Sequence, residues 1–253
     1  MSVLCLIANP AEPAVDASLV AAIQHDTHGE INWLNPGVAC EIVKPAAADP
    51  VAIARGYIGE LPVDAALVPI ANRRKRLLVA DMDSTMIDQE CIDELADAVG
   101  IKDQVAAITE RAMRGELDFE GALRTRVGLI KGLERQVIEE IRRERITLAA
   151  GSRALVQTMK AYGAFTSLVS GGFTFFAEYI ARRLGFDEAV ANVLEFDGSR
   201  LTGTVAEPIV GREMKLSRLR SLASDQDIPV AATIAVGDGA NDLDMIRAAG
   251  LGV

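Results

Sequence analysis

The chain has 253 residues, and half of them are hydrophobic although only 4% are aromatic. This length allows one or two domains, and a core built from aliphatic side chains is typical of parallel sheets covered by helices. The net charge of -10 disfavours nucleic acid and anionic membranes as partners, because both select for clustered Lys and Arg. The one basic run, 73–76, fits a solvated linker better than a nucleic-acid contact.

The cysteines and the hydropathy pattern indicate a cytoplasmic protein. Cys5, Cys40 and Cys91 form no C-x-x-C motif, as expected of unpaired thiols in a reducing compartment. The apolar stretch 3–8 is too short for a signal-peptide core, and no stretch approaches the roughly 18 apolar residues that span a bilayer. We therefore expect no disulfide framework and no membrane span.

Residues 1–72 are predicted to form a small α+β domain. Apolar runs alternate with helical segments in the order β-α-β-β-α-β, which is the ferredoxin-like or split βαβ arrangement. Pro69 falls inside the last strand, where it removes a ladder donor. A shift from acidic to basic composition places the domain boundary near Asn72. The strands are expected at 3–8, 31–34, 39–43 and 65–70, and the helices at about 16–25 and 49–58.

Residues 73–253 are predicted to form an α/β domain with a doubly wound parallel sheet, because short apolar strands alternate with helices. Between the first two strands lies a charged, strongly helical stretch, about 88–147, which we expect to form a cap over the edge of the sheet. The strands are expected at 77–80, 165–169 and 234–236, and the helices at about 152–161, 173–184 and 212–223.

A polar cluster follows each of these strands, at the carboxyl ends where open parallel sheets bind ligands. The first cluster is Asp81-Met82-Asp83-Ser84-Thr85. Two carboxylates this close at the end of a buried strand need a cation, a proton or a helix N-terminus. Taken alone, the cluster would fit a helix N-cap equally well.

The second cluster is Ser170-Gly171-Gly172, which is expected to open the helix that starts at Phe173. A hydroxyl and unobstructed backbone N–H groups at a helix N-terminus form an anion site. A plain turn would have the same composition.

The third cluster, GDGAND at 237–242, follows the last strand. Its Asp238 and Asp242 offer the hard oxygen ligands that Mg²⁺ prefers. An Asx turn with a helix cap would also explain this cluster. Together, three polar clusters after three buried strands predict one phosphate and metal site.

Two cations lie on apolar helix faces: Lys215 shares a stripe with Leu219, and Arg126 shares one with Phe119 and Leu123. Such cations are usually snorkelling or paired. Beside a predicted phosphate site, we expect them to contact anionic groups instead.

Composition excludes two other phosphatase chemistries. His25 and His28 are the only histidines and lie in the N-terminal domain, so the α/β domain has no phosphohistidine nucleophile and no His-rich metal centre. No cysteine has an arginine six positions later, the spacing that a thiolate phosphatase loop needs. The remaining nucleophile is a carboxylate.

In order and spacing, the three clusters and Lys215 resemble the four motifs of the haloacid dehalogenase superfamily. The stretch 81–96, with Glu90 seven positions after Asp83, is similar to its phosphoserine phosphatase branch. The resemblance runs from about residue 76 to the end of the chain. By element order, the N-terminal domain resembles the small regulatory ACT-like domain of bacterial members of that branch.

The resemblance implies a role for each motif residue. Asp81 would be the nucleophile, Asp83 the general acid and base, and Lys215 would hold the phosphoryl group. Mg²⁺ would be held by Asp81, the backbone carbonyl of Asp83, and Asp238. The implied substrate-binding residues are Glu90 for an ammonium, Arg126 for a carboxylate, Ser170 and Gly171 for phosphoryl oxygens, Asn241 in support, and Met113 and Phe119 as apolar cap residues.

On this resemblance, the function is Mg²⁺-dependent hydrolysis of O-phosphoserine through a phospho-aspartate, the last step of serine biosynthesis. Two alternatives stay open: a phosphatase or phosphotransferase for another small phosphometabolite, and a catalytically silent amino-acid-binding regulator. A homodimer is expected on resemblance alone. Because the family's α/β domain continues beyond a strand that begins near Leu251, we also expect the sequence to be truncated at Val253.

Overall fold

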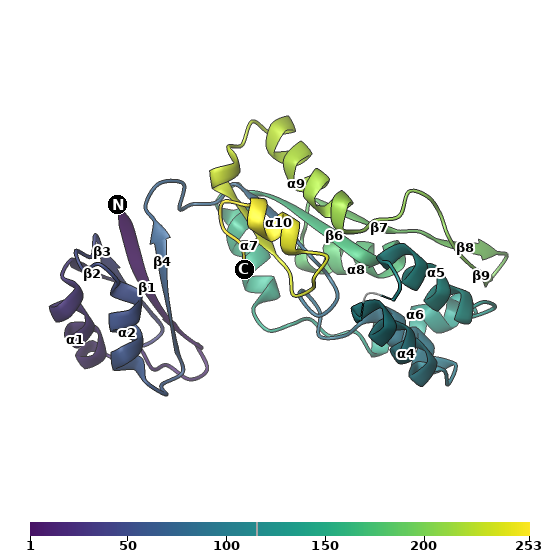
Figure 1. The fold of residues 1–253 in the computed structure, drawn as a ribbon, viewed down its shortest axis with the longest axis horizontal. Helices are drawn as coiled ribbons and strands as arrows, with labels where there is room; N and C mark the ends of the chain where they lie inside the picture. Colours follow the sequence, from purple (N-terminus) through teal and green to yellow (C-terminus); the bar gives the residue numbers. More distant parts are fainter. Residues whose placement is uncertain (115) are drawn as a thin grey trace. The chain divides into compact units, whose positions relative to one another are not determined.

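The structure is a computed structural model that describes residues 1–114 and 116–253, without the side chain of Met113. The chain divides into two compact units, Met1–Arg73 and Arg74–Val253 (Figure 1). Each unit has its own buried hydrophobic core. Within the described residues, no helix is both long and apolar enough to cross a membrane.

Met1–Arg73 forms a four-stranded antiparallel sheet in the order β2-β3-β1-β4. Alternate strand residues such as Leu4, Leu6 and Ile42 pack with the two helices in one core, so the helices cover one face. The predicted ferredoxin-like arrangement is confirmed, and Pro69 ends the edge strand β4, where a missing N–H costs least. The elements are β1 (Ser2–Ala8), α1 (Ala17–Thr27), β2 (Glu30–Asn35), β3 (Ala39–Val43), α2 (Pro50–Ile58) and β4 (Val63–Pro69).

An aspartate begins each of these helices. Asp16 accepts a hydrogen bond from the Leu19 N–H at 2.7 Å, and Asp49 accepts one from the Ala52 N–H at 2.9 Å. These bonds satisfy N–H groups that have no partner in the first helical turn. Pro50 occupies the first turn of α2, where its missing donor is not needed.

Arg74–Val253 contains a parallel sheet in the order β10-β5-β6-β7. A parallel bridge between Ala235 and Gly252 places the last residues of the chain beside β10. The strands are β5 (Leu77–Ala80), β6 (Phe165–Phe173), β7 (Glu188–Asn192) and β10 (Thr233–Val236).

Alternate residues of this sheet face two helical layers, as the predicted doubly wound arrangement requires. Leu78 and Leu168 share a core with α7 (Ser152–Ala161) and α8 (Thr174–Leu184). The other face packs in a second core with further helices. That layer consists of α9 (Arg212–Asp225) and α10 (Leu243–Ala248).

The insert between β5 and β6 is helical, as predicted, and leaves the sheet through a paired neck. Ile87 and Leu148 form an antiparallel bridge, and the Asp88 N–H donates to the Thr147 carbonyl at 3.2 Å. Figure 1 shows α4, α5 and α6 gathered at one end of this unit with a β-hairpin. The elements are α3 (Cys91–Ala98), α4 (Lys102–Met113), α5 (Phe119–Leu129), α6 (Arg135–Glu144), β8 (Leu194–Asp197) and β9 (Arg200–Val205).

One sequence expectation was only partly right. The helix expected after Ser170-Gly171-Gly172 is present, but it begins at Thr174 with Phe173 as its N-cap residue, one residue later than predicted. The cluster itself is extended, because β6 continues through Phe173. The register between β6 and β7 shifts between Val169 and Phe173, which marks a β-bulge, and extra residues in a bulge re-aim neighbouring side chains. The cluster is therefore bulged strand backbone that leads directly into α8.

Candidate active site

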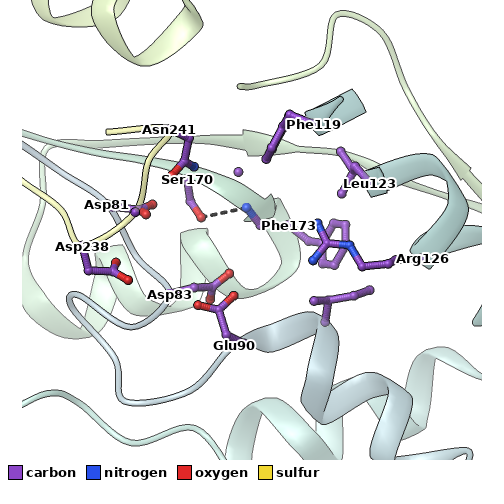
Figure 2. Close-up of a pocket in the computed structure, with 14 residues that line it drawn as sticks. Asp81, Asp83, Glu90, Phe119, Leu123, Arg126, Ser170, Phe173, Asp238 and Asn241 are labelled. Carbon is purple, nitrogen blue, oxygen red and sulfur yellow. Dashed lines mark hydrogen bonds between the residues drawn. The ribbon is translucent and has the colours of Figure 1, made fainter. Parts of the chain in front are cut away.

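One pocket lies where the ends of β5, β6 and β10 meet the cap (Figure 2). Lys215 lies behind its wall, fully buried, and the side chain of Met113 is outside the described residues. In Figure 2 the Asp81 and Asp238 carboxylates lie at one end of the pocket and the Arg126 guanidinium at the other. The predicted site residues that line it are Asp81, Asp83, Glu90, Phe119, Arg126, Ser170, Gly171, Asp238 and Asn241.

Lys215 bridges two carboxylates. Its Nζ lies 2.8 Å from Asp81 Oδ1 and 2.7 Å from Asp242 Oδ1. Asp81 Oδ1 also accepts the Met82 N–H at 2.8 Å, and Asp242 Oδ2 accepts the Gly239 N–H at 3.1 Å. A buried lysine needs such partners, because an unpaired charge in the interior is costly. Asp81 is therefore held in one orientation at the end of β5.

Burial raises the pKa of both carboxyl groups of the first cluster. Desolvation raises the pKa of Asp81 to about 7, with Lys215 opposing the shift and the charge of Asp242 adding to it. Desolvation also raises the pKa of Asp83 to about 8, and the nearby Glu90 adds to that shift. Among the described residues, the buried Asp83 Oδ1 has no hydrogen-bond partner. Such a carboxyl group favours its protonated form at neutral pH.

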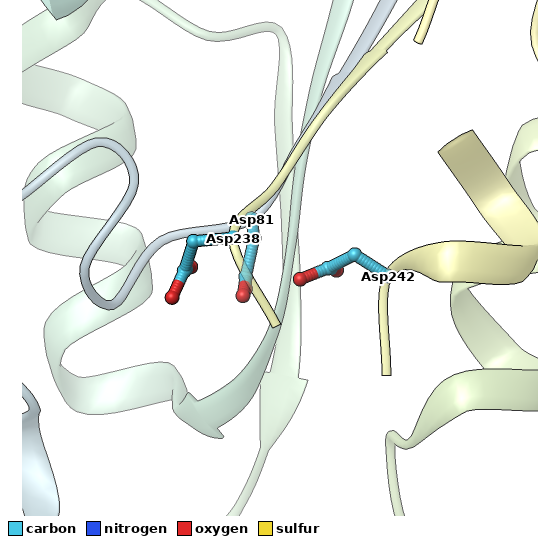
Figure 3. A group of neighbouring side chains, drawn as sticks. All are labelled: Asp81, Asp238 and Asp242. Carbon is cyan, nitrogen blue, oxygen red and sulfur yellow. The ribbon is translucent and has the colours of Figure 1, made fainter. Parts of the chain in front are cut away.

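Three carboxylates could surround a cation. Asp81, Asp238 and Asp242 each offer an oxygen, and these atoms lie within 4.8 Å of one another (Figure 3). Asp242 is already bound to Lys215, whereas Asp238 is exposed and accepts only the Thr85 hydroxyl, at 2.8 Å, among its described hydrogen bonds. Asp81 and Asp238 therefore fit a hard divalent cation best. The Asp83 carboxylate is not one of the three.

The bulge of β6 forms the wall opposite Asp83. Ser170 Oγ accepts the Gly172 N–H at 2.9 Å, drawn as a dashed line in Figure 2. The hydroxyl hydrogen of Ser170 stays available to donate to a ligand. A Cβ at Gly172 would lie 2.6 Å from Asp83 Oδ2, and one at Gly171 would lie 3.0 Å from Phe119 Cζ. Both glycines are therefore needed for the close approach of strand, carboxylate and cap.

The cap contributes one acidic and one basic side chain. Glu90 Oε1 accepts the Ser84 hydroxyl at 2.6 Å, and burial raises its pKa. Arg126 donates only to neutral oxygens in the described part of the chain, at 3.3 Å to the Ala122 carbonyl and 3.4 Å to Thr109 Oγ1. Burial lowers the pKa of Arg126, while the charge of Glu90 opposes that shift. A half-buried guanidinium with long, neutral contacts is suited to an anionic ligand.

Sequence reasoning assigned no role to several residues that support the site. Ser84 and Thr85 belong to the first cluster, and their hydroxyls hold Glu90 and Asp238. Asn192 bonds the Gly171 carbonyl and lies on β7, a strand that the sequence analysis did not predict. Ser84 and Thr85 could have been found from the sequence, because they stand inside the motif.

The family model for haloacid dehalogenase-like hydrolases matches residues 78–247, which include every motif described above. The chain belongs to this family. In this chain, the pocket lies at the carboxyl ends of strands within the matched region.

Related proteins extend the comparison. The phosphoserine phosphatase of Streptomyces coelicolor is 47% identical over 195 residues, which is 76% of this chain and 47% of that protein. A haloacid dehalogenase family hydrolase from Salmonella enterica serovar Typhi has a TM-score of 0.84 at 29% identity, covering 100% of this chain and 89% of its own. A phosphoserine phosphatase solved as a phospho-aspartyl intermediate analogue has a TM-score of 0.65 at 39% identity, over 70% of this chain and 84% of its own. The chain spans about half the length of the Streptomyces coelicolor and Haemophilus influenzae relatives, 47% and 56%.

Proposed function

We propose that this chain is a Mg²⁺-dependent phosphatase that hydrolyses O-phosphoserine to serine and phosphate through a phospho-aspartate on Asp81. In this role it catalyses the last step of serine biosynthesis. The similarity to phosphoserine phosphatases over most of the α/β unit supports the reaction. The arrangement of charges in the pocket supports the substrate.

The observation that carries the proposal is the Arg126 guanidinium with no carboxylate among its described hydrogen-bond partners. It faces the same pocket as Glu90, and Asp81 lies at the other end. Phosphoserine carries a carboxylate and an ammonium, which complement Arg126 and Glu90 in charge, and a phosphoryl group that would face the nucleophile Asp81. A phosphometabolite without an amino-acid end would offer no charged group to Arg126 or Glu90 in a closed site, and their neutral hydrogen bonds would be the only compensation for their burial among the described residues.

In the first half-reaction, an Asp81 carboxylate oxygen attacks phosphorus in line with the departing serine oxygen. Lys215 offsets the negative charge that burial would otherwise disfavour on Asp81. Asp83 gives its proton to the serine oxygen as the P–O bond breaks, which its raised pKa favours. The products are serine and a phosphorylated Asp81.

In the second half-reaction, the ionised Asp83 takes a proton from a water molecule that attacks phosphorus. The bond from phosphorus to Asp81 breaks, phosphate leaves, and both carboxyl groups return to their starting states. Ser170 and the neighbouring glycine backbone would hold the phosphoryl oxygens in both steps. One residue thus acts as acid first and as base second.

The residues fit the metal that this family uses. Asp81 and Asp238 would hold Mg²⁺ with the backbone carbonyl of Asp83, and Asn241 supports the same loop. When bound, the ion supplies charge neutralisation and a template for in-line transfer. The cation also favours the ionised form of Asp81, which attack requires.

For Met1–Arg73 we propose an ACT-like regulatory role and a part in homodimer formation. The βαββαβ order and the antiparallel sheet support the first of these. Size-exclusion chromatography with light scattering tests dimer formation, and activity with and without serine tests the regulatory role. A monomer whose activity does not respond to serine would contradict this assignment.

Phosphate release by the full chain tests the main proposal. We expect release from O-phospho-L-serine with Mg²⁺ and almost none with EDTA. Release should be slower from 3-phosphoglycerate, which lacks the ammonium, and from phosphoethanolamine, which lacks the carboxylate. Faster turnover of either analogue would favour another small phosphometabolite. Serine binding without any phosphate release would favour a silent regulator.

A further inference from the structure

Asn192 lies at the end of β7 with its side-chain amide almost fully buried, at 1% exposure. It does not line the pocket. Its Nδ2 donates to the Gly171 carbonyl at 2.8 Å and to the Val210 carbonyl at 3.3 Å, and its Oδ1 accepts the Val210 N–H at 2.7 Å. One side chain thus satisfies three main-chain groups from two segments that are distant in sequence.

We propose that Asn192 is a positioning residue for the phosphoryl-binding end of the pocket, an inference that rests on the proposed phosphatase function. The amide fixes the bulge of β6 against the segment that begins α9. It acts through backbone groups, and it touches no substrate.

The first arm of this arrangement orients Ser170. In a planar trans peptide the C=O and N–H groups point in opposite directions. When Asn192 holds the Gly171 carbonyl, the Gly172 N–H of the same peptide must point the other way, where it donates to Ser170 Oγ at 2.9 Å. Because that oxygen is engaged as an acceptor, the Ser170 hydroxyl hydrogen is directed to another acceptor. A phosphoryl oxygen in the pocket would be that acceptor.

The second arm reaches the lysine. Val210 precedes Gly211, the N-cap residue of α9, and the Gly211 carbonyl accepts the Lys215 N–H at 3.1 Å. Lys215 in turn holds Asp81 at 2.8 Å. Asn192 therefore sets the position of the Ser170 hydroxyl relative to the helix that carries Lys215. The hydroxyl that would hold a phosphoryl oxygen and the lysine that holds the nucleophile Asp81 are thus tied together by one amide.

The chemistry of the amide explains why a close analogue would fail. Asn192 must donate to two carbonyls and accept one N–H, and a carboxylate has no proton to donate. Asn192→Asp keeps the shape and the acceptor for Val210 but places a negative oxygen against the Gly171 carbonyl. The Gly171–Gly172 peptide is then free to rotate, and the Ser170 hydroxyl loses its fixed direction.

The test compares Asn192→Asp with a matched control at the other end of the same two strands. Thr166 lies at the start of β6, is fully buried, and its hydroxyl donates to Asp187 just before β7 at 2.9 Å. Thr166→Val removes the hydroxyl that bonds both the carboxylate and the N–H of Asp187, and Thr166 does not line the pocket. Both variants are measured well below their melting temperatures.

We expect Asn192→Asp to lower kcat on the order of 10²-fold, the loss typical of one misplaced transition-state donor, with KM changed less than about threefold. The same factor is expected for phosphoserine and for 4-nitrophenyl phosphate, since both carry the phosphoryl group. With Mg²⁺ present, calorimetry should show inorganic phosphate binding weakened about tenfold or more. Thr166→Val should keep wild-type kcat and phosphate affinity even if it melts earlier.

Equal kcat for Asn192→Asp and wild type, or equal losses in both variants, would overturn the proposal, because either result assigns Asn192 to stability alone. Failure of the proposed substrate is a separate outcome. If wild type ignores phosphoserine but hydrolyses 4-nitrophenyl phosphate and binds inorganic phosphate, the Asn192 comparison still decides on those two readouts. A wild-type chain that neither binds phosphate nor hydrolyses the aryl ester would overturn both proposals.

Discussion

The two ends of the pocket are built differently. At the phosphoryl end, buried Lys215 contacts Asp81 at 2.8 Å and Asp242 at 2.7 Å. At the cap end, the hydrogen bonds of Arg126 to described residues all go to neutral oxygens, at 3.3–3.4 Å. Lys215 thus has anionic partners within the protein, whereas Arg126 has a charge that a ligand would satisfy. Substitutions at the first end should therefore affect every substrate, and those at the second should discriminate between substrates.

The largest effect is expected at the phosphoryl end of the pocket. Asp81→Asn should lower kcat by roughly 10³-fold or more for every phosphomonoester, because an amide cannot accept the phosphoryl group. Steady-state phosphate release measures the loss, and circular dichroism verifies the fold. Activity within about tenfold of wild type would rule out Asp81 as the nucleophile.

A somewhat smaller effect is expected two positions further along the motif, at Asp83. Asp83→Asn should lower kcat for phosphoserine by roughly 10²–10⁴-fold, since the leaving serine oxygen loses its proton donor. An aryl phosphate has a better leaving group, so its loss should be smaller in the same variant. If the two substrates lose equally, Asp83 is not the acid of the first step.

The cap end should separate substrates. Arg126→Ala should cost about 2–5 kcal/mol in kcat/KM for phosphoserine, the range for one partner of a desolvated charge pair. Phosphoethanolamine lacks the carboxylate and should be scarcely affected, whereas Glu90→Gln should impair both. Equal losses on both substrates for Arg126→Ala would show that the arginine positions the cap rather than reading the carboxylate.

A different kind of effect concerns the stability of the metal-free protein. The pKa of Asp83 rises from 3.8 to about 8 on folding, because burial disfavours its charge. Between these values the folded state binds more protons than the unfolded state, so the free energy of unfolding should fall as pH rises from about 4 to about 8. Urea unfolding in EDTA at several pH values measures this slope. Asp83→Asn should make the dependence of the free energy of unfolding on pH less steep. An unchanged slope would contradict the conclusion that burial raises the pKa of Asp83.

The parts of the fold that could be predicted have strong local signals. The apolar runs 77–80 and 234–236 predicted two strands, and the polar residues that follow each run predicted the functional end of that strand. The last of these polar segments is the GDGAND loop. β7, with the sequence EAVAN, was missed because alanine and glutamate are weak strand formers, and its strand state comes from the ladder to β6. The hairpin β8–β9 was missed although Asp197-Gly198 is a turn signal.

The same reasoning applies to the candidate site. The three polar clusters were predicted because each follows a strand directly, so position in the sequence indicates position in the pocket. Asn192 could not be predicted, since its role depends on contacts with Gly171 and Val210 that exist only in the folded chain. The bulge at 170–172 could not be predicted either, because its register depends on β7.

The central claim is that turnover of phosphoserine passes through a phosphorylated Asp81. Its most direct measurement is acid quenching during turnover, followed by borohydride reduction of the acyl phosphate and mass spectrometry of the peptide that contains residue 81. The account predicts that Asp81 alone is converted to homoserine, only when phosphoserine and Mg²⁺ are both present. Release of phosphate with no residue trapped, or trapping at a different carboxylate, would contradict it.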